Sequence, residues 1–143
     1  MVRQLTVFLE NSPGRLAALT RAIGDSGINM RALMVADTAD FGVVRIICDD
    51  PGFAQSALEG AGYGVTVTDV IAVVVPDRPG GLADVLEVLG AAEINVEYAY
   101  CFVKPSGEGA IDVFRVEEPE RAGRILADAG LRVLTQEEVR LAG

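Results

Sequence analysis

Two short polar turns carry the residues whose types and spacing are best suited to holding a small charged molecule. The first is Asn11-Ser12-Pro13-Gly14, and the second, Asp77-Arg78-Pro79-Gly80, follows 66 residues later. In each turn a proline fixes φ, and a glycine lets another molecule approach the backbone closely. A helix that begins at the glycine would direct unpaired N–H groups outward, which suits a carboxylate. The chemistry that these turns favour is therefore binding rather than bond making.

Two asparagines provide polar groups for the ammonium of the same ligand. Asn29 and Asn95 each follow an isoleucine and begin an expected strand. An amide side chain both donates and accepts, so it suits a zwitterion, whereas an ionised Asp77 only accepts and would repel a carboxylate. We therefore expect two unequal sites, of which the one with Asn11 and Asn29 is the better. The candidate ligand-binding residues are Asn11, Ser12, Pro13, Gly14, Arg15, Leu16, Asn29, Met30, Asp77, Arg78, Pro79, Gly80, Gly81, Leu82, Asn95 and Val96.

The same residues also have a purely structural interpretation, which the sequence leaves open. A Pro-Gly pair before a helix is a common turn signal, and Ser12 fits an N-cap that precedes a proline at the first helical position. The two asparagines can satisfy nearby backbone groups without any ligand. Tyr98, Tyr100 and Phe102 alternate along an expected strand, which indicates core or interface packing.

The two turns belong to a longer internal repeat. The halves match at an offset of 66 through the expected first helix, and the offset then drifts to 67 at Gly42/Gly109 and later to 68. Drift at loops with the apolar pattern kept is typical of a duplicated domain. The repeat predicts two domains, 1–69 and 70–143. Units of this size bury only about 60% of their unfolded surface, so we expect them to pack on one another or on another chain.

Each half shows the pattern of four strands and two helices. Apolar alternation and helical spacing predict the order strand, helix, strand, strand, helix, strand. Strands are expected at about 5–9, 29–36, 41–48, 65–67, 70–75, 95–103, 110–116 and 131–135, and helices after Pro13 and Pro51, at about 80–89 and after Pro119. This is an α+β chain of two tandem ferredoxin-like βαββαβ units, in which antiparallel sheets carry helices on one face.

Composition excludes several classes of function. With 21 acidic and 12 basic residues the net charge is −9, which argues against nucleic acid. The chain has no histidine and two cysteines, Cys48 and Cys101, so we expect no metal site, no cofactor and two buried free thiols, with a disulfide as the alternative. It has no apolar run of about 18 residues, and its start does not resemble a signal peptide, so we expect no membrane span and a cytoplasmic protein.

Charged residues differ in sign between the two halves. Arg31 corresponds to Glu97, and Arg45, three residues after Gly42, corresponds to Asp112, three residues after Gly109. One interpretation is that these positions oppose each other across an intrachain or dimer contact. Solvated polar positions on an open sheet face explain the pattern equally well.

The turn, the helix spacing and the Ile-Asn pair together resemble a known family. The stretch Asn11–Leu16, followed by Gly27-Ile28-Asn29 at the next strand, closely resembles the start of an ACT domain. The second copy matches in layout but has Asp77 where the first has Asn11. The resemblance covers both halves, so the chain resembles small stand-alone proteins built of two ACT domains and no enzyme.

This resemblance implies a function and partners. It implies a non-enzymatic sensor or regulatory subunit that binds a small molecule, an amino acid by expectation, where the Pro-Gly turn of one unit meets the second strand of another. A partner enzyme is possible, and a homodimer is expected because duplicated sheets leave edge strands to cover. The alternative is a protein–protein interaction module without a ligand. A small hydrolase such as an acylphosphatase is disfavoured because the turns lack a matched arginine–asparagine cradle in both halves.

Overall fold

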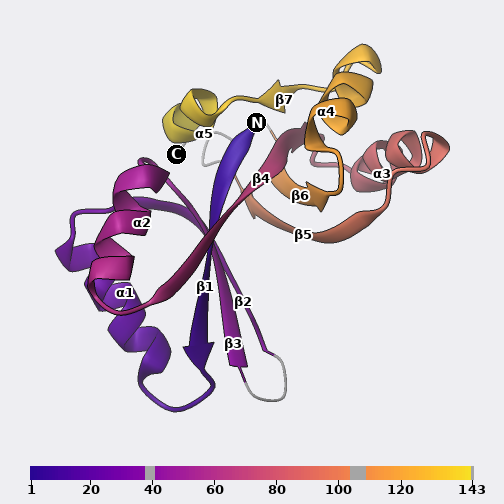
Figure 1. Ribbon diagram of the computed structural model, residues 1–143. Coiled ribbons are helices and arrows are strands. Elements are labelled where there is room, and N and C mark those ends of the chain that lie inside the picture. Colours follow the sequence, from indigo (N-terminus) through magenta and orange to yellow (C-terminus); the bar gives the residue numbers. More distant parts are fainter. Residues whose placement is uncertain (38–40, 104–108, 143) are drawn as a thin grey trace. The chain divides into compact units, whose positions relative to one another are not determined.

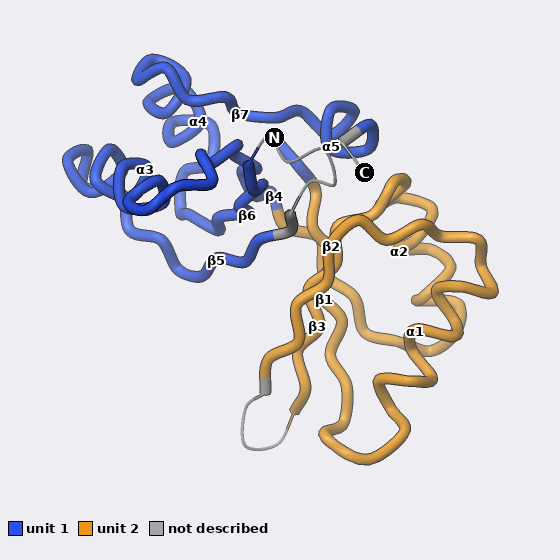
Figure 2. The backbone as a smooth tube through the Cα atoms, turned by 180° about the vertical axis from the view of Figure 1, so that it is seen from behind, with its two compact units in different colours: residues 1–2, 69–143 blue, residues 3–68 orange. Residues whose placement is uncertain are grey.

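The computed structural model describes residues 1–37, 41–103 and 109–142. They form two compact units: an N-terminal unit of residues 3–68, and a C-terminal unit of residues 1–2 together with 69 onward (Figure 2). The assignment of residues 1–69 and 70–143 as two separate domains stays a prediction.

The N-terminal unit is a four-stranded sheet with two helices. Its elements are β1 (Val2–Glu10), α1 (Arg15–Asp25), β2 (Met30–Asp37), β3 (Phe41–Cys48), α2 (Pro51–Gly60) and the first part of β4 (Gly64–Val75). The strand order is β2-β3-β1-β4, and β3 pairs antiparallel with both β1 and β2. Both helices lie on the same side of this sheet (Figure 1).

The C-terminal unit repeats this arrangement. After the second part of β4 come α3 (Gly81–Ala91), β5 (Val96–Val103), β6 (Ala110–Val116), α4 (Pro119–Asp128), β7 (Val133–Leu134) and α5 (Gln136–Ala142). β6 pairs antiparallel with β4 and β5, and β7 pairs with β4. The order β5-β6-β4-β7 reproduces that of the first unit. The predicted α+β class with two βαββαβ repeats is confirmed, and the single strand β4 serves both repeats.

The helix α5 was not expected from the sequence. The last strand is shorter than predicted, and a helix begins directly after Thr135. The backbone N–H of Glu138 donates to Thr135 Oγ1 over 3.2 Å, and the backbone N–H of Thr135 donates to Glu138 Oε1 over 3.0 Å. This reciprocal pair is a capping box, and the spacing Thr-x-x-Glu is its sequence signal.

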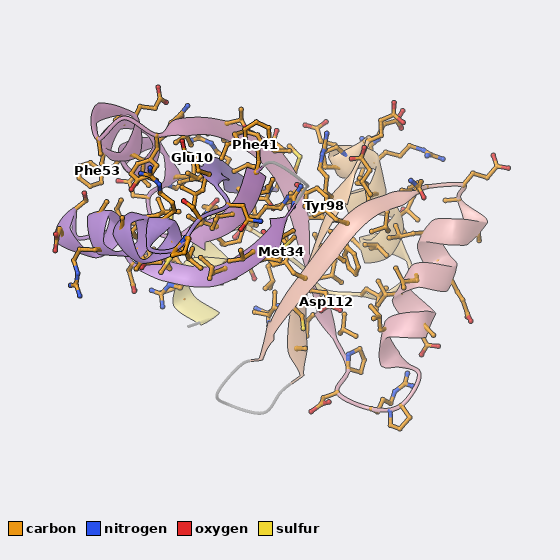
Figure 3. The ribbon with its side chains drawn as sticks, turned by 90° about the horizontal axis from the view of Figure 1, so that it is seen from below. Glu10, Met34, Phe41, Phe53, Tyr98 and Asp112 are labelled. Atoms are coloured by element: carbon orange, nitrogen blue, oxygen red, sulfur yellow. The ribbon has the colours of Figure 1, made fainter. Side chains whose placement is uncertain are left out.

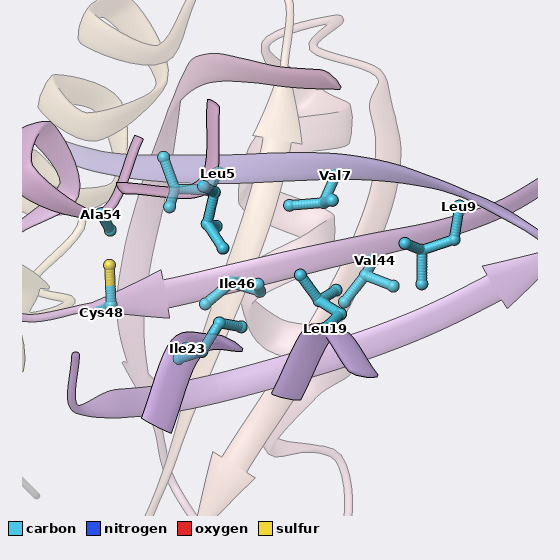
Figure 4. Packing of buried hydrophobic residues seen from close by; sticks show 10 residues of the cluster. Leu5, Val7, Leu9, Leu19, Ile23, Val44, Ile46, Cys48 and Ala54 are labelled. Carbon is cyan, nitrogen blue, oxygen red and sulfur yellow. The ribbon is translucent and has the colours of Figure 1, made fainter. Parts of the chain in front are cut away.

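Each unit has its own apolar core between sheet and helices. In the N-terminal unit, alternate residues of β1 and β3 face the inner sides of α1 and α2 (Figure 4). The core residues labelled there are Leu5, Val7, Leu9, Leu19, Ile23, Val44, Ile46, Cys48 and Ala54. In the C-terminal unit the corresponding cluster is Ile71, Val73, Val75, Val85, Leu89, Phe114, Val116, Ala122 and Leu126.

Two leucines of α3 depart from the expected helix pattern. Helical spacing predicts that Leu82 and Leu86 face inward with Val85 and Leu89. Val85 and Leu89 are buried, but Leu82 is 46% and Leu86 38% exposed. Fewer residues of α3 face the core than are apolar, so the helix carries apolar side chains outside the core. Tyr98 and Tyr100 on β5 are half-buried, and the side chain of Phe102 lies outside the described residues.

The strand register corrects one correspondence between the halves. Val7 pairs with Val44 in the first unit, and the equivalent Val73 pairs with Asp112 in the second. Asp112, labelled in Figure 3, therefore occupies the position of Val44 in the row that faces the helices. Arg45 is the next residue along and lies on the opposite face, because successive side chains alternate. The predicted equivalence of Arg45 and Asp112 is wrong, since a one-residue slip exchanges the faces of a strand.

Candidate ligand-binding site

The first turn leads into α1 through a left-handed glycine. Gly14 has φ 86° and is the N-cap of α1, so the expected cap at Ser12 is wrong. The N–H of Arg15 donates to Ser12 O over 3.3 Å, and the first helical bond runs from Ala18 N–H to Gly14 O over 3.0 Å. No side chain of the described residues caps this helix. The earliest helical N–H groups, such as that of Leu16, have no intrahelical acceptor and can receive an anion.

The second turn has the same backbone conformation but is packed more tightly. Gly80 has φ 85° and is the N-cap of α3, and Asp84 N–H donates to Gly80 O over 3.0 Å. Gly81 stands where the first unit has Arg15, and a Cβ on Gly81 would lie 2.2 Å from Pro76 O. Only glycine fits this backbone position without a rearrangement. The two turns are therefore alike in shape but not in their tolerance of side chains.

Both turn arginines are held by carboxylates of their own unit. Arg15 Nη2 lies 3.0 Å from Glu10 Oε2, and Arg78 Nη2 lies 2.6 Å from Asp84 Oδ2. All four side chains are more than half exposed, so the pairs contribute little stability. Since these guanidinium groups already have anionic partners, an incoming carboxylate would rely mainly on backbone N–H groups.

Asn29 belongs to a polar cluster at the start of β2. Its side-chain Nδ2 donates to Asp49 Oδ2 over 3.4 Å, and its backbone carbonyl oxygen accepts from the backbone N–H of Asp49 over 3.2 Å. Asp49 also accepts from Arg31 Nε over 2.7 Å and from Arg31 Nη2 over 3.0 Å, a bidentate pair that fixes the carboxylate. With Nδ2 directed at Asp49, Oδ1 of Asn29 is the atom that can accept a hydrogen bond from an ammonium group.

Asn95 lies in a small acidic cavity. The cavity has a volume of about 190 Å³ and is lined by Glu93, Ile94, Asn95, Glu97, Glu117, Glu118 and Arg121. Arg121 Nη1 lies 3.8 Å from Glu118, and Glu97 pairs with Arg115 over 3.3 Å. Four carboxylates against one arginine in the lining would attract an ammonium group and repel a carboxylate.

Within one unit, the turn and the asparagine lie at opposite ends of the sheet. Asn11 follows Glu10, which pairs with Phe41, whereas Asn29 precedes Met30, which pairs with Cys48. Seven residues of strand separate these ends, or about 23 Å at roughly 3.3 Å per residue. Asp77 and Asn95 are separated in the same way, because Val75 pairs with Ala110 and Val96 with Val116.

One amino acid is too short to reach from the turn to the asparagine of the same unit. The predicted residues could share a ligand only if two units contribute, and the set as a whole stays a prediction. Of the residues outside the turns, Val96 does come together with Leu82, in a pocket beside α3.

The two cysteines are free and differ in their surroundings. Cys48 is fully buried in the first core, and burial raises the pKa of its thiol to about 11. Cys101 is exposed on β5, so the expectation of two buried thiols is wrong for this residue. Partial loss of solvent around the sulfur and the neighbouring Asp112 carboxylate also raise the pKa of the Cys101 thiol.

Native labelling should therefore distinguish the two thiols. Since only a thiolate on the surface reacts quickly, an alkylating reagent at mildly alkaline pH should modify Cys101 slowly and Cys48 only after unfolding. Mass spectrometry of partially labelled protein, with and without denaturant, measures the order. A Cys101→Ser variant is the control and should take up no label until it unfolds. Early labelling of Cys48 would contradict the buried environment.

Among the described residues, no group of three or more Cys, Asp or Glu side chains is placed to hold a metal ion. No helix among these residues is long and apolar enough to cross a membrane.

Comparison with known proteins places the chain in a family. The family model of the ACT domain pair matches residues 1–141. A crystal structure of a protein from Bacteroides thetaiotaomicron is 35% identical with a TM-score of 0.90, over 96% of this chain and 94% of that one. The ligand-free regulatory subunit of aspartate kinase from Thermus thermophilus is 19% identical with a TM-score of 0.64, over 90% and 92% of the chains. The corresponding subunit from Thermus flavus is 20% identical with a TM-score of 0.61, over the same shares.

A comparison with curated proteins found no match. The family match extends over both repeats, and the structural similarity extends over nearly the whole of each chain. The chain therefore belongs to the family of ACT domain pairs.

Proposed function

We propose that this ACT domain pair is a non-enzymatic regulatory protein that binds an amino acid through its Pro-Gly turns. The observation that carries the proposal is the matched geometry of Gly14 and Gly80, which begin α1 and α3 at φ 86° and 85°. Neither helix start has a side-chain cap among the described residues. Each therefore offers backbone N–H groups to a carboxylate.

The ammonium group of the ligand would be held by the start of a second strand. Asn29 is the stronger candidate, since Arg31 and Asp49 fix its surroundings and Oδ1 is available as an acceptor. A turn and an Asn29 on one ligand must come from different units, so the proposal includes a homodimer or another assembly. The proposal also includes a cytoplasmic location and a partner enzyme. The partner enzyme is supported by the fold that this chain shares with a regulatory subunit of aspartate kinase.

A thermal-shift screen of the twenty amino acids tests the proposal. A ligand that binds only the folded state at a concentration 100 times its Kd adds about 2.7 kcal/mol of stability. We expect at least one amino acid to raise the melting temperature, and Asn29→Ala to remove most of that shift. Asn95→Ala is the matched control and should retain more of it, because Asp77 and the acidic cavity make the second site poorer.

If no amino acid raised the melting temperature, the result would instead favour a protein–protein interaction module. The specific observation for that alternative is the edge strand β2, where Leu33 and Val35 pair with Ile46 and Val44 yet are 42% and 48% exposed. They lie in the row that faces the helices, so this unit leaves an apolar edge uncovered. An equal loss of the thermal shift in Asn29→Ala and Asn95→Ala would contradict the preference for the Asn29 site.

A further inference from the structure

Asp112 is a carboxylate in a position built for an apolar side chain. It stands in the inward row of β6 between Ala110 and Phe114, and only 8% of it is exposed. At the equivalent position the first unit has Val44, which is fully buried. A charge in an apolar row is unfavourable unless something compensates it. Its presence therefore requires a physical explanation.

The compensation that the described residues provide is small. The Cys101 thiol donates a hydrogen bond to the Asp112 carboxylate. A thiol is a weak donor, and an ionised carboxylate can accept about four hydrogen bonds. No arginine or lysine among the described residues forms an ion pair with Asp112. Burial raises the pKa of this carboxyl, as expected for a charge that is poorly compensated.

Asp112 opens into a pocket rather than into the closed core. The pocket has a volume of about 320 Å³ and lies between α3 and the strands β5 and β6. Its walls are mainly apolar, with Leu82 and Leu86 from the helix and Val96, Ala99 and Phe114 from the strands. This also accounts for the exposure of the two leucines, which line the pocket instead of the core. A concave apolar site with one convergent polar group is the usual form of a small-molecule site.

We propose that this pocket is a second ligand site, which binds a small organic ammonium ion with an apolar body. The N–H groups of the cation donate to the Asp112 carboxylate, and the apolar body lies against Leu82 and Leu86. The charge of the ligand matches that of the pocket, and its N–H groups match the unused acceptor capacity of the carboxylate. The site lies wholly within the C-terminal unit and shares only Leu82 and Val96 with the residues predicted from the sequence. It contains neither the asparagines nor the Pro-Gly turns, so it does not rest on the proposed function.

The first unit has no such site at the equivalent place. There Val35 and Val44 stand where the second unit has Cys101 and Asp112, as the two strand registers show. The two copies thus share the strand pairing at this place but differ in the one charge that selects a cation. The proposed site is specific to the second copy.

Calorimetric titration of the full chain at neutral pH with 3-methylbutylamine tests the proposal. We expect saturable binding of this amine and none of 4-methylpentanoate or 3-methylbutan-1-ol, which keep the branched body but replace the ammonium group. Absence of amine binding, or equal binding of the alcohol, would overturn the proposal.

Variants then assign the binding to Asp112. Asp112→Asn keeps the shape and removes the charge, and it should weaken the amine by about tenfold to a hundredfold, since a hydrogen bond to a charged group is lost. Glu87→Gln removes an exposed charge from α3 and should leave the affinity unchanged. The melting temperature of each variant establishes that it is folded. Unchanged affinity in Asp112→Asn would also overturn the proposal.

Asn29→Ala separates the two proposals. It should reduce amino-acid binding at the turns and leave binding of 3-methylbutylamine intact. Loss of amine binding in this variant would place the amine elsewhere and count against the Asp112 pocket.

Discussion

Replacing Gly81 with alanine should strongly destabilise the C-terminal unit. A Cβ there would lie 2.2 Å from the carbonyl oxygen of Pro76 and 3.2 Å from its carbonyl carbon. Both are backbone atoms, so no side-chain rotation can relieve the overlap, and the turn between β4 and α3 must move. Such overpacking costs on the order of 3 kcal/mol. Because a loss of 1 kcal/mol lowers the melting temperature of a small domain by about 4–8 °C, calorimetry should detect it easily.

Gly90 provides the matched control, because it lies in the same helix and has open space around it. A Cβ at Gly90 meets nothing within 4 Å, and alanine is favoured over glycine in a helix by up to about 1 kcal/mol. Gly90→Ala should therefore leave stability unchanged or raise it slightly. If Gly81→Ala were as stable as Gly90→Ala, the turn could move away from Pro76 without loss of stability. The close approach to Pro76 would then not explain why residue 81 is a glycine.

The same pair of turns shows what a sequence repeat predicts well. The shared Pro-Gly pair and the apolar alternation predicted the order of strands and helices along the chain as far as β7, and helical spacing placed Val85 and Leu89 inward. These features depend on local geometry and on periods of 2 and 3.6 residues, which are visible in a single sequence. The repeat also shows that Gly81 replaces Arg15, but the reason, a close approach to the backbone of Pro76, depends on the folded structure of the turn.

The site was predicted less well, because it depends on relations that a repeat does not contain. The sequence grouped Asn11 with Asn29, although the register places them at opposite ends of one sheet. It aligned Asp112 with Arg45, because Gly42 and Gly109 are at an offset of 67 while the paired strands follow an offset of 68. A single residue of drift decides whether a carboxylate faces solvent or the core. The available signal was Asp112 itself, an acidic residue between Ile111 and Val113 in an expected strand.

Replacing Asp112 with valine should stabilise the protein at neutral pH. Valine is the residue at the equivalent position of the first unit, where it is fully buried, so its shape suits this row. The change removes a poorly compensated charge and adds apolar burial. Removing a buried polar group that lacks a good partner is worth on the order of 1–3 kcal/mol. Chemical denaturation of both proteins at pH 7 measures the difference.

The pH dependence of stability separates the effect of the Asp112 charge from the effect of packing. The pKa of Asp112 is raised in the folded protein, so the folded state holds this proton more tightly than the unfolded state does. Ionisation of Asp112 therefore lowers stability above the unfolded pKa of about 3.9, and this loss disappears as the pH falls below that value. Asp112→Asn should gain stability near pH 7 and little near pH 3, whereas Asp112→Val should keep its packing gain at both. A constant gain for Asp112→Asn would show that the charge is not the cause.

The reverse substitution in the first unit completes the comparison. Val44→Asp places a carboxylate in the same row without the Cys101 donor, so it should destabilise that unit, and more at neutral than at acid pH. If Asp112→Val becomes more stable but loses binding of 3-methylbutylamine, the carboxylate lowers stability and serves binding, as functional residues often do. If it becomes more stable and still binds the amine, the apolar walls alone hold the ligand, and Asp112 has no part in selecting it.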